Sequence, residues 1–263
     1  MTLIAIDHVS RLFGDPNGKA AVKALDDVSI SVQRNDFLCL LGPSGCGKST
    51  LLNMIAGFDR PTGGTVSVGG QVVSAPGADR GVVFQQPTLM PWLTVWENVA
   101  FHLTMRGAGK AERREKAQRF IDMVGLRGFE NHFPNELSGG MSQRVGIARA
   151  LLMNPEVILM DEPFGALDEQ TKMEMHAELA RIWRESQSTI VFVTHGIDES
   201  LALSTHVAVM SARPGRIREL IAIDMPRPRD PTSPLFNDYK RHILSLLRPE
   251  PMTLVPPAQQ DAA

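Results

Sequence analysis

The sequence predicts an α/β protein with a parallel β-sheet at its core, a small antiparallel β layer at the N-terminus and an inserted helical subdomain. Three observations lead to this prediction. Short apolar runs alternate with helix-like segments over most of the chain, which is typical of a parallel sheet covered on both faces. The first part of the chain instead alternates strands with turns. Between residues 86 and 135 the strand signal disappears.

The strand pattern is clearest where apolar residues are bounded by turn-forming residues. Such residues at 15–18 and 61–64 separate the early strands. Helices are expected at 49–57, at 145–153 and at 110–124, the last being charge-rich, solvent-facing and ended by Gly125. The predicted strands are 4–9, 28–32, 37–41, 65–68, 81–84, 157–160, 189–193 and 207–211.

The organisation expected from this pattern is one folded unit followed by a tail. Residues 1–248 form the unit, with the helical subdomain inserted at about 86–150. After Pro226 the chain becomes rich in proline and arginine, and a short helix-like run follows at 240–247. Residues 249–263 are expected to be a loose tail.

Composition limits the function classes. A chain of 263 residues that is 43% hydrophobic can bury a large core. Its net charge of −2 gives no basic footprint for a phosphate backbone, so we expect no nucleic-acid partner. No run approaches the ~18 apolar residues that a membrane span needs, and the first residues do not resemble a secretory signal. Any work at a membrane must therefore be done through a partner.

Residues 42–49 fit the phosphate-binding pattern GxxxxGK[ST], between a predicted strand and a predicted helix. Its glycines let backbone N–H groups approach phosphates at a helix N-terminus. Lys48 should reach the β- and γ-phosphates, and Ser49 should offer its hydroxyl to Mg²⁺. An ordinary glycine turn before a helix is the alternative. The predicted nucleoside triphosphate site comprises Gly42, Pro43, Ser44, Gly45, Cys46, Gly47, Lys48, Ser49 and Thr50.

The two cysteines, Cys39 and Cys46, have no metal-binding spacing and are expected to be free thiols in a reducing compartment. Cys46 lies near a predicted helix N-terminus, which could lower the pKa of its thiol. The hypothesis is that Cys46 reacts with alkylating agents and that a bound nucleotide protects it.

Polar residues follow three predicted strands at the sheet edge where α/β proteins bind ligands. Asp161 can hold Mg²⁺ directly or through water, and Glu162 can polarise the water that attacks the γ-phosphate; the alternative is a solvated acidic turn. His195 could donate a hydrogen bond to the γ-phosphate, although a lone histidine is more often structural. Gln85 could contact Mg²⁺ or the water, but is a weak signal alone.

A second helix start follows Leu137, where Ser138 is a candidate N-cap before Gly139 and Gly140. Such a helix N-terminus can receive an anion. A plain helix cap is the alternative.

Taken in chain order, the phosphate loop, Gln85, the Leu-Ser-Gly-Gly segment at 137–140, Asp161 with Glu162, and His195 resemble the ATP-binding subunit of an ABC transporter. The resemblance covers residues 4 to about 223. It implies ATP and Mg²⁺ as cofactors and a homodimer that closes head to tail over two ATP molecules.

The resemblance also implies roles for individual residues. Ser138 and Gly140 of one subunit would bind the γ-phosphate held by Lys48 of the other, and Asp168 would lie at the dimer seam. Phe13 would stack on adenine, unless it is a packing residue. Three departures from the family pattern remove no catalytic group: Met141 stands for the usual Gln, Gly196 for an Asp, and Asn35-Asp36 for Gly-Glu.

Segments 77–85, 89–99, 161–168 and 211–217 resemble the nitrate, sulfonate and taurine importer branch, and Asp79-Arg80 is most similar to taurine transporters. This implies an importer of taurine or a related sulfonate, or of a nitrate-like anion. Residues 86–99 would receive a helix from an integral-membrane permease. A periplasmic or extracellular substrate-binding protein would deliver the substrate to that permease. The subunit would be peripheral on the cytoplasmic face of the membrane.

Two other classes of protein are the alternatives. A soluble ABC-type ATPase could remodel a ribosome, DNA or iron–sulfur assembly machinery, but tandem ATPase units, coiled-coil insertions and basic arms are absent from the sequence. A GTPase or small-molecule kinase is disfavoured by the absence of an Asn-Lys-x-Asp segment and by the presence of Ser138-Gly139-Gly140.

Overall fold

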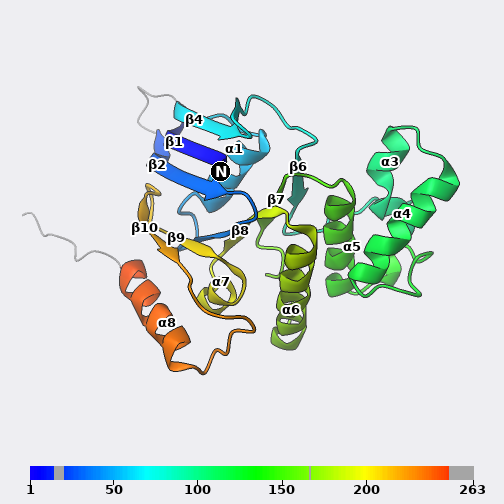
Figure 1. Ribbon diagram of the computed structural model, residues 1–263. Helices are drawn as coiled ribbons and strands as arrows, with labels where there is room; N and C mark the ends of the chain where they lie inside the picture. Colours follow the sequence, from blue (N-terminus) through cyan, green and yellow to red (C-terminus); the bar gives the residue numbers. More distant parts are fainter. Residues whose placement is uncertain (15–20, 166, 249–263) are drawn as a thin grey trace, which may run out of the picture.

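The computed structural model describes residues 1–14, 21–165 and 167–248, so the predicted turn at 15–18 and the predicted tail lie outside the described residues. An antiparallel sheet forms the N-terminal layer, as predicted (Figure 1). Its strand order is β2-β1-β4-β5, with β1 (Thr2–Phe13), β2 (Val22–Gln33), β4 (Gly63–Val68) and β5 (Gln71–Val72).

Strands β1 and β2 are longer than the sequence pattern predicted. Their pairing continues to Phe13 opposite Val22, through several register shifts that interrupt the alternation of polar and apolar residues. Asp27 has a φ of 55° within β2, so the strand bends locally. The polar residues at this bend interrupt the alternating pattern, and for this reason the sequence predicted a shorter strand.

The second sheet is the core, with strand order β10-β9-β3-β8-β7-β6. The pairs from β9 to β6 are parallel, which confirms the predicted core, whereas β10 is an antiparallel edge strand that the sequence did not predict. The strands are β3 (Phe37–Leu41), β6 (Arg80–Val83), β7 (Val157–Asp161), β8 (Thr189–Thr194), β9 (His206–Met210) and β10 (Ile217–Ala222).

The two faces of the core sheet bury different clusters of side chains. In β3, Leu38 and Leu40 pack with α1 (Lys48–Ala56) and the antiparallel layer, whereas Phe37, Cys39 and Leu41 pack on the opposite face. That opposite face is covered by α6 (Glu169–Ser186), α7 (Ile197–Leu203) and α8 (Pro234–Leu247). Burial on both faces explains why the central strands are apolar throughout.

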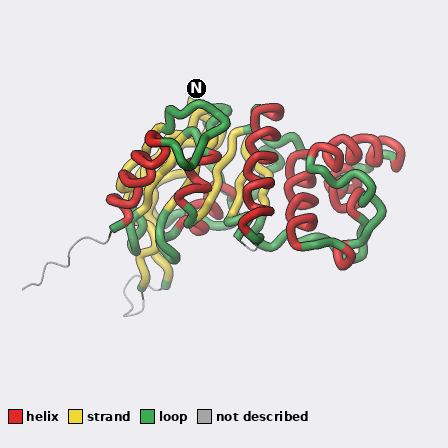
Figure 2. The backbone as a smooth tube through the Cα atoms, turned by 90° about the horizontal axis from the view of Figure 1, so that it is seen from below, coloured by secondary structure: helices red, strands yellow, loops and turns green. Residues whose placement is uncertain are grey.

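The chain between β6 and β7 forms the helical subdomain, which Figure 2 shows at one end of the molecule, away from most of the strands. Its helices pack together, with α2 against both α4 and α5. The elements are α2 (Val95–Val99), α3 (Phe101–Met105), α4 (Lys110–Met123), the 3₁₀ turn η1 (Pro134–Glu136) and α5 (Gly139–Leu152).

Serine side chains cap two helices, of which α8 begins earlier than predicted. Ser138 accepts a hydrogen bond from the N–H of Met141 at 3.2 Å, which confirms the predicted N-cap, and α5 runs from Gly139 through the helical segment predicted from 145. Ser233 accepts from the N–H of Phe236 at 3.3 Å, and Pro234 takes the first helical position of α8, where its missing N–H is harmless. None of the described helices combines the length and apolar character needed to cross a membrane.

Candidate nucleotide site

The phosphate loop joins β3 to α1, as predicted. Gly45 and Gly47 have φ angles of 74° and 103°, a region that favours glycine. A Cβ at Gly47 would also lie 2.6 Å from Cδ2 of Leu25. Helix α1 begins at Lys48 without a side-chain cap or an acidic residue in its first turn, so its N–H groups remain available to an anion.

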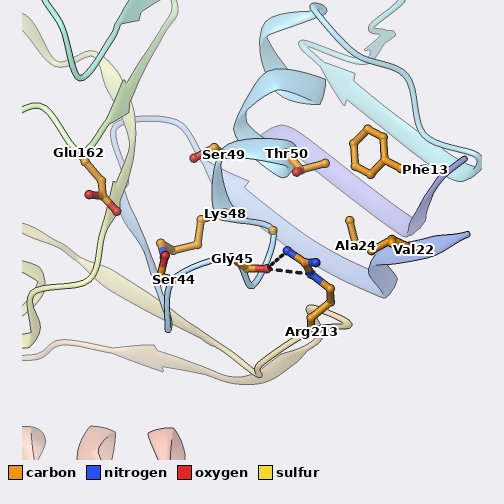
Figure 3. Close-up of a pocket in the computed structure, with 11 residues that line it drawn as sticks. Phe13, Val22, Ala24, Ser44, Gly45, Lys48, Ser49, Thr50, Glu162 and Arg213 are labelled. Atoms are coloured by element: carbon orange, nitrogen blue, oxygen red, sulfur yellow. Dashed lines mark hydrogen bonds between the residues drawn. The ribbon is translucent and has the colours of Figure 1, made fainter. Parts of the chain in front are cut away.

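A cleft of about 360 Å³ opens over this loop (Figure 3). It runs between the antiparallel layer on one side and the end of β7 on the other. Its size and its polar floor suit a ligand with a phosphate chain. The residues that line it are Phe13, Val22, Ala24, Ser44, Gly45, Gly47, Lys48, Ser49, Thr50, Glu162 and Arg213.

Lys48 lies at the centre of the cleft. Its ammonium group donates hydrogen bonds to the carbonyl oxygens of Gly42 at 2.9 Å and Pro43 at 3.1 Å. The side chain is buried, and within the described part of the chain it forms no ion pair. A buried cation held only by neutral carbonyls gains more from an anion, so this arrangement favours phosphate binding.

Ser49 and Asp161 meet at one side of the cleft, where the serine hydroxyl donates to Oδ1 of Asp161 at 3.0 Å. A hydroxyl and one carboxylate suit Mg²⁺, which keeps several waters and takes further oxygens from a nucleotide. In the residues that the structure describes, no group of three or more His, Cys, Asp and Glu could hold a metal alone. The donor set therefore fits a magnesium ion that arrives with its nucleotide.

Burial raises the pKa of Asp161 above its usual value of 3.8, the hydrogen bond from Ser49 opposes this, and the Glu162 charge adds to the rise. The protonated form therefore stabilises the fold at low pH, and this contribution is lost as the pH rises through the raised pKa. Asp161→Asn keeps the shape without the charge. At pH 7, without nucleotide, we expect the variant to melt about 2 °C higher than the unmodified protein.

The prediction is checked by measuring the melting temperatures of Asp161→Asn and of the unmodified protein at a series of pH values. The difference in melting temperature should shrink as the pH falls through the raised pKa of Asp161, because Asp161 itself then becomes protonated. Asp198→Asn is the matched control, because Asp198 is exposed and pairs with Lys240 at 2.7 Å. Equal melting temperatures of Asp161→Asn and the unmodified protein at pH 7 would contradict the stated cost of the buried charge.

Glu162 follows β7 with a φ of 43°, an unusual conformation for a residue other than glycine. Its N–H donates to the carbonyl of Val193 at 3.0 Å, which fixes the turn against β8. A backbone conformation of this kind costs roughly 1–3 kcal/mol of free energy, and it persists where the surrounding structure enforces it, often at functional sites. The carboxylate is presented to the cleft and lies 3.2 Å from Nδ1 of His195.

The residues on both sides of His195, Thr194 and Gly196, belong to a hydrogen-bond network. The hydroxyl of Thr194 donates to Glu199 and accepts from the N–H of Gly196 at 2.9 Å. His176 of α6 lies 2.9 Å from the other oxygen of Glu199. The loop that carries His195 is thereby tied to both α6 and α7.

Two predicted catalytic residues, His195 and Gln85, are absent from the lining of the cleft, and so are four residues predicted to bind phosphate or magnesium: Gly42, Pro43, Cys46 and Asp161. His195 reaches it only through Glu162 and lines a neighbouring cavity of about 880 Å³. Gln85 is exposed just after β6 and does not line the cleft. Phe13, by contrast, lines the cleft with 41% of its surface exposed, and the guanidinium of Arg11 lies 4.5 Å from its ring centre. This exposure suits a stacking platform better than a packing residue.

The helix start that the sequence predicts as a second anion site does not line the cleft. A Cβ at Gly140 would lie 3.3 Å from Thr171 and 3.5 Å from Leu167, so the start of α5 adjoins the start of α6. There Asp168 accepts from the N–H of Thr171 at 3.0 Å, and its hydrogen bonds with Thr171 lower the pKa of its carboxyl. None of the four predicted residues at these two helix starts lines the cleft: Ser138, Gly139, Gly140 and Asp168.

Sequence reasoning missed three residues of the cleft wall. Val22 and Ala24 come from the part of β2 that the pattern did not predict, and Arg213 comes from the turn between β9 and β10. The sequence motifs include Arg213 only as part of the segment 211–217. Its position between a buried strand and a glycine was the signal available.

The expected lowering of the pKa of Cys46 is wrong, which removes the basis for a reactive thiol. The side chain is 1% exposed, and burial raises the pKa of its thiol in spite of Lys48 and the nearby helix start. We therefore expect alkylation by iodoacetamide at pH 8 to be at least about tenfold slower than for a free thiol, measured peptide by peptide with mass spectrometry. Unfolding the chain supplies the control, since it should restore the ordinary rate. Rapid labelling of the folded protein would contradict this.

Comparison with known proteins agrees with the geometry. The sequence model described as "ABC transporter" matches residues 25–165. The chain is 53% identical to an uncharacterized ABC transporter ATP-binding protein of Methanocaldococcus jannaschii, covering 94% of this chain and 92% of that one. It is 46% identical to the nitrate import ATP-binding protein NrtD of Synechocystis sp. (93% and 95% covered) and 48% identical to the taurine import ATP-binding protein TauB of Burkholderia thailandensis (86% of each).

Among solved structures, the chain is similar to the ATP-binding cassette MJ0796 in a dimeric post-hydrolysis state bound to ADP and Pi. The TM-score is 0.74 and the identity 34%, with 85% of this chain and 100% of that one covered. The chain therefore belongs to the ABC transporter family, as an ATP-binding protein. Within that family it falls in the nitrate, sulfonate and taurine importer branch, as the sequence motifs predicted.

Proposed function

We propose that this chain hydrolyses ATP to power the import of taurine or a related sulfonate, or of a nitrate-like anion. The nitrate, aliphatic sulfonate and taurine import proteins among its relatives support this cargo class. The single observation that carries the ATPase assignment is the division of the site. The cleft contains the phosphate loop and Glu162, whereas Ser138 and Gly140 lie outside its lining in the same chain.

This division calls for a second copy of the chain. Ser138 and the exposed Gly139 have open space in front of them, and a Cβ at Gly139 would meet nothing within 4 Å. In a head-to-tail homodimer, the start of α5 of one subunit faces the cleft of the other. The dimeric structures of the similar cassette MJ0796 support a dimer of this chain.

The residues of the cleft then take distinct roles. Lys48 and the loop N–H groups bind the phosphates, and Phe13 stacks on adenine. Ser49, Gln85 and Asp161 would hold Mg²⁺, which neutralises charge on the β- and γ-phosphate oxygens. Glu162 orients the attacking water, and His195 with Ser138 of the other subunit stabilises the charge that develops on the transferred group. Asp168 lies at the seam between subunits.

The partner surface follows from the segment 86–99. The side-chain amide of Asn98, which is fully buried, donates to the carbonyls of Met90 at 3.2 Å and Leu93 at 2.9 Å and so fixes the loop before α2. Trp92 in this loop is 71% exposed. A rigid loop with an exposed aromatic residue suits a protein contact, which we assign to a helix of an integral-membrane permease. The chain then works as a peripheral subunit at the cytoplasmic face of the membrane.

Reconstitution tests this function. The chain is combined in vesicles with its permease and substrate-binding protein, and ATP hydrolysis is measured with taurine, alkanesulfonates or nitrate. One of these anions should stimulate hydrolysis and accumulate inside the vesicles. Purification of the chain with ribosomes or nucleic acid, and not with a permease, would contradict the proposal.

A further inference from the structure

The turn between β9 and β10 brings a cation to the cleft that none of these roles uses. Nε and Nη2 of Arg213 both donate to the carbonyl oxygen of Gly45, at 3.3 and 3.2 Å (Figure 3). A guanidinium has five donors, and here these two share one neutral acceptor. Over the described residues Arg213 has no carboxylate partner, whereas Arg216 in the same turn pairs with Asp26.

The backbone of this turn is fixed to both neighbouring elements. The N–H of Gly215 donates to the carbonyl of Ala24 at 2.9 Å, and the N–H of Asp26 donates to the carbonyl of Gly215 at 3.0 Å. A Cβ at Gly215 would lie 2.0 Å from the carbonyl oxygen of Cys46, so only glycine allows this approach to the phosphate loop. The turn therefore holds Arg213 in place, and only its exposed side chain needs to move to meet a ligand.

The position of Arg213 along the cleft identifies which part of a nucleotide it meets. Figure 3 shows Arg213 near Val22 and Ala24, on the side of Phe13, with Glu162 across the cleft and Lys48 between them. A nucleotide with its base on Phe13 and its terminal phosphate near Glu162 would extend past Arg213, and the α-phosphate is the phosphate nearest the base.

We propose that Arg213 binds the α-phosphate of the adenine nucleotide, an assignment that rests on the proposed ATPase function. The guanidinium leaves the Gly45 carbonyl for the phosphate, because a charge-assisted hydrogen bond to an anion is stronger than one to a neutral carbonyl. Arg213 is thus a second phosphate-binding cation, supplied by a turn far from the loop in sequence.

The test is the affinity of the full-length chain for ADP, measured by titration calorimetry. Arg213→Ala should raise Kd about tenfold, and Arg213→Lys should restore most of the affinity because it keeps the charge. The dependence of Kd on salt concentration should also become weaker in Arg213→Ala, since one phosphate contact that salt screens is gone. A merely structural effect of the substitution would not change this salt dependence.

Arg216→Ala is the matched control, because it removes a cation from the same turn without removing one from the cleft lining. It should change Kd by less than about twofold. Equal affinities of Arg213→Ala and the unmodified protein, or equal losses in the Arg213→Ala and Arg216→Ala variants, would overturn the inference alone. No binding of ATP or ADP by the unmodified protein would overturn the proposed function as well.

Discussion

Glu162→Gln should lower ATP turnover by at least about 100-fold while leaving nucleotide binding intact. Glutamine keeps the length of the side chain and can still accept a hydrogen bond from His195, but it cannot polarise the attacking water. ATP therefore stays bound, and the ATP-bound dimer should accumulate. Phosphate release measures the turnover, and light scattering with size-exclusion chromatography measures the dimer in the presence of ATP.

The other end of the same strand offers a matched control. Glu156 precedes β7, is about half exposed and forms an ion pair with Arg34 at 2.9 Å. Glu156→Gln makes the same chemical change away from the cleft, and its turnover should stay within about twofold of the unmodified protein. Undiminished hydrolysis by Glu162→Gln would show that another group directs the water. A monomer that holds ATP without dimerising would instead contradict the shared site.

Much of the site could be predicted because its chemistry is local in the sequence. The phosphate loop carries its glycines, lysine and serine within nine residues, and a buried apolar strand precedes it. Strands β7 and β8 are likewise recognisable in the sequence, because each is a nearly continuous run of apolar residues that the structure buries. Parallel strands place their carboxyl ends at one edge of a sheet. For this reason Glu162 and His195 meet in space although they are 33 residues apart in the sequence.

The features that sequence reasoning missed depend on contacts between distant segments. Arg213 reaches the cleft because hydrogen bonds join Gly215 to Ala24 and to Asp26, a pairing that no local sequence pattern predicts. The pKa of Cys46 is raised because burial outweighs the effect of the nearby helix start, and burial at one position cannot be read from its neighbours. The edge strand β10 is partly exposed and mixes polar with apolar residues, so its pattern resembles that of a loop.

Mixing two inactive variants should restore activity if the site is shared between subunits. Lys48→Ala removes the cation that we propose binds the phosphates, and Ser138→Arg places a large side chain at the start of α5. Each variant alone should lose at least about 100-fold in turnover. Both should fold, because Lys48 is a buried cation without an ion pair among the described residues and Ser138 is exposed, so that its loss as a cap costs only ~1 kcal/mol.

In a mixed dimer, one cleft combines the intact Lys48 of the Ser138→Arg subunit with the intact Ser138 of the Lys48→Ala subunit. The other cleft carries both defects. When the two variants are mixed equally, half of the dimers are mixed and each holds one complete site, so turnover should recover to roughly a quarter of the unmodified protein at most. The control is each variant at the same total concentration, which should stay inactive. A mixture no more active than its components would mean that Lys48 and Ser138 do not act on the same ATP across a subunit interface.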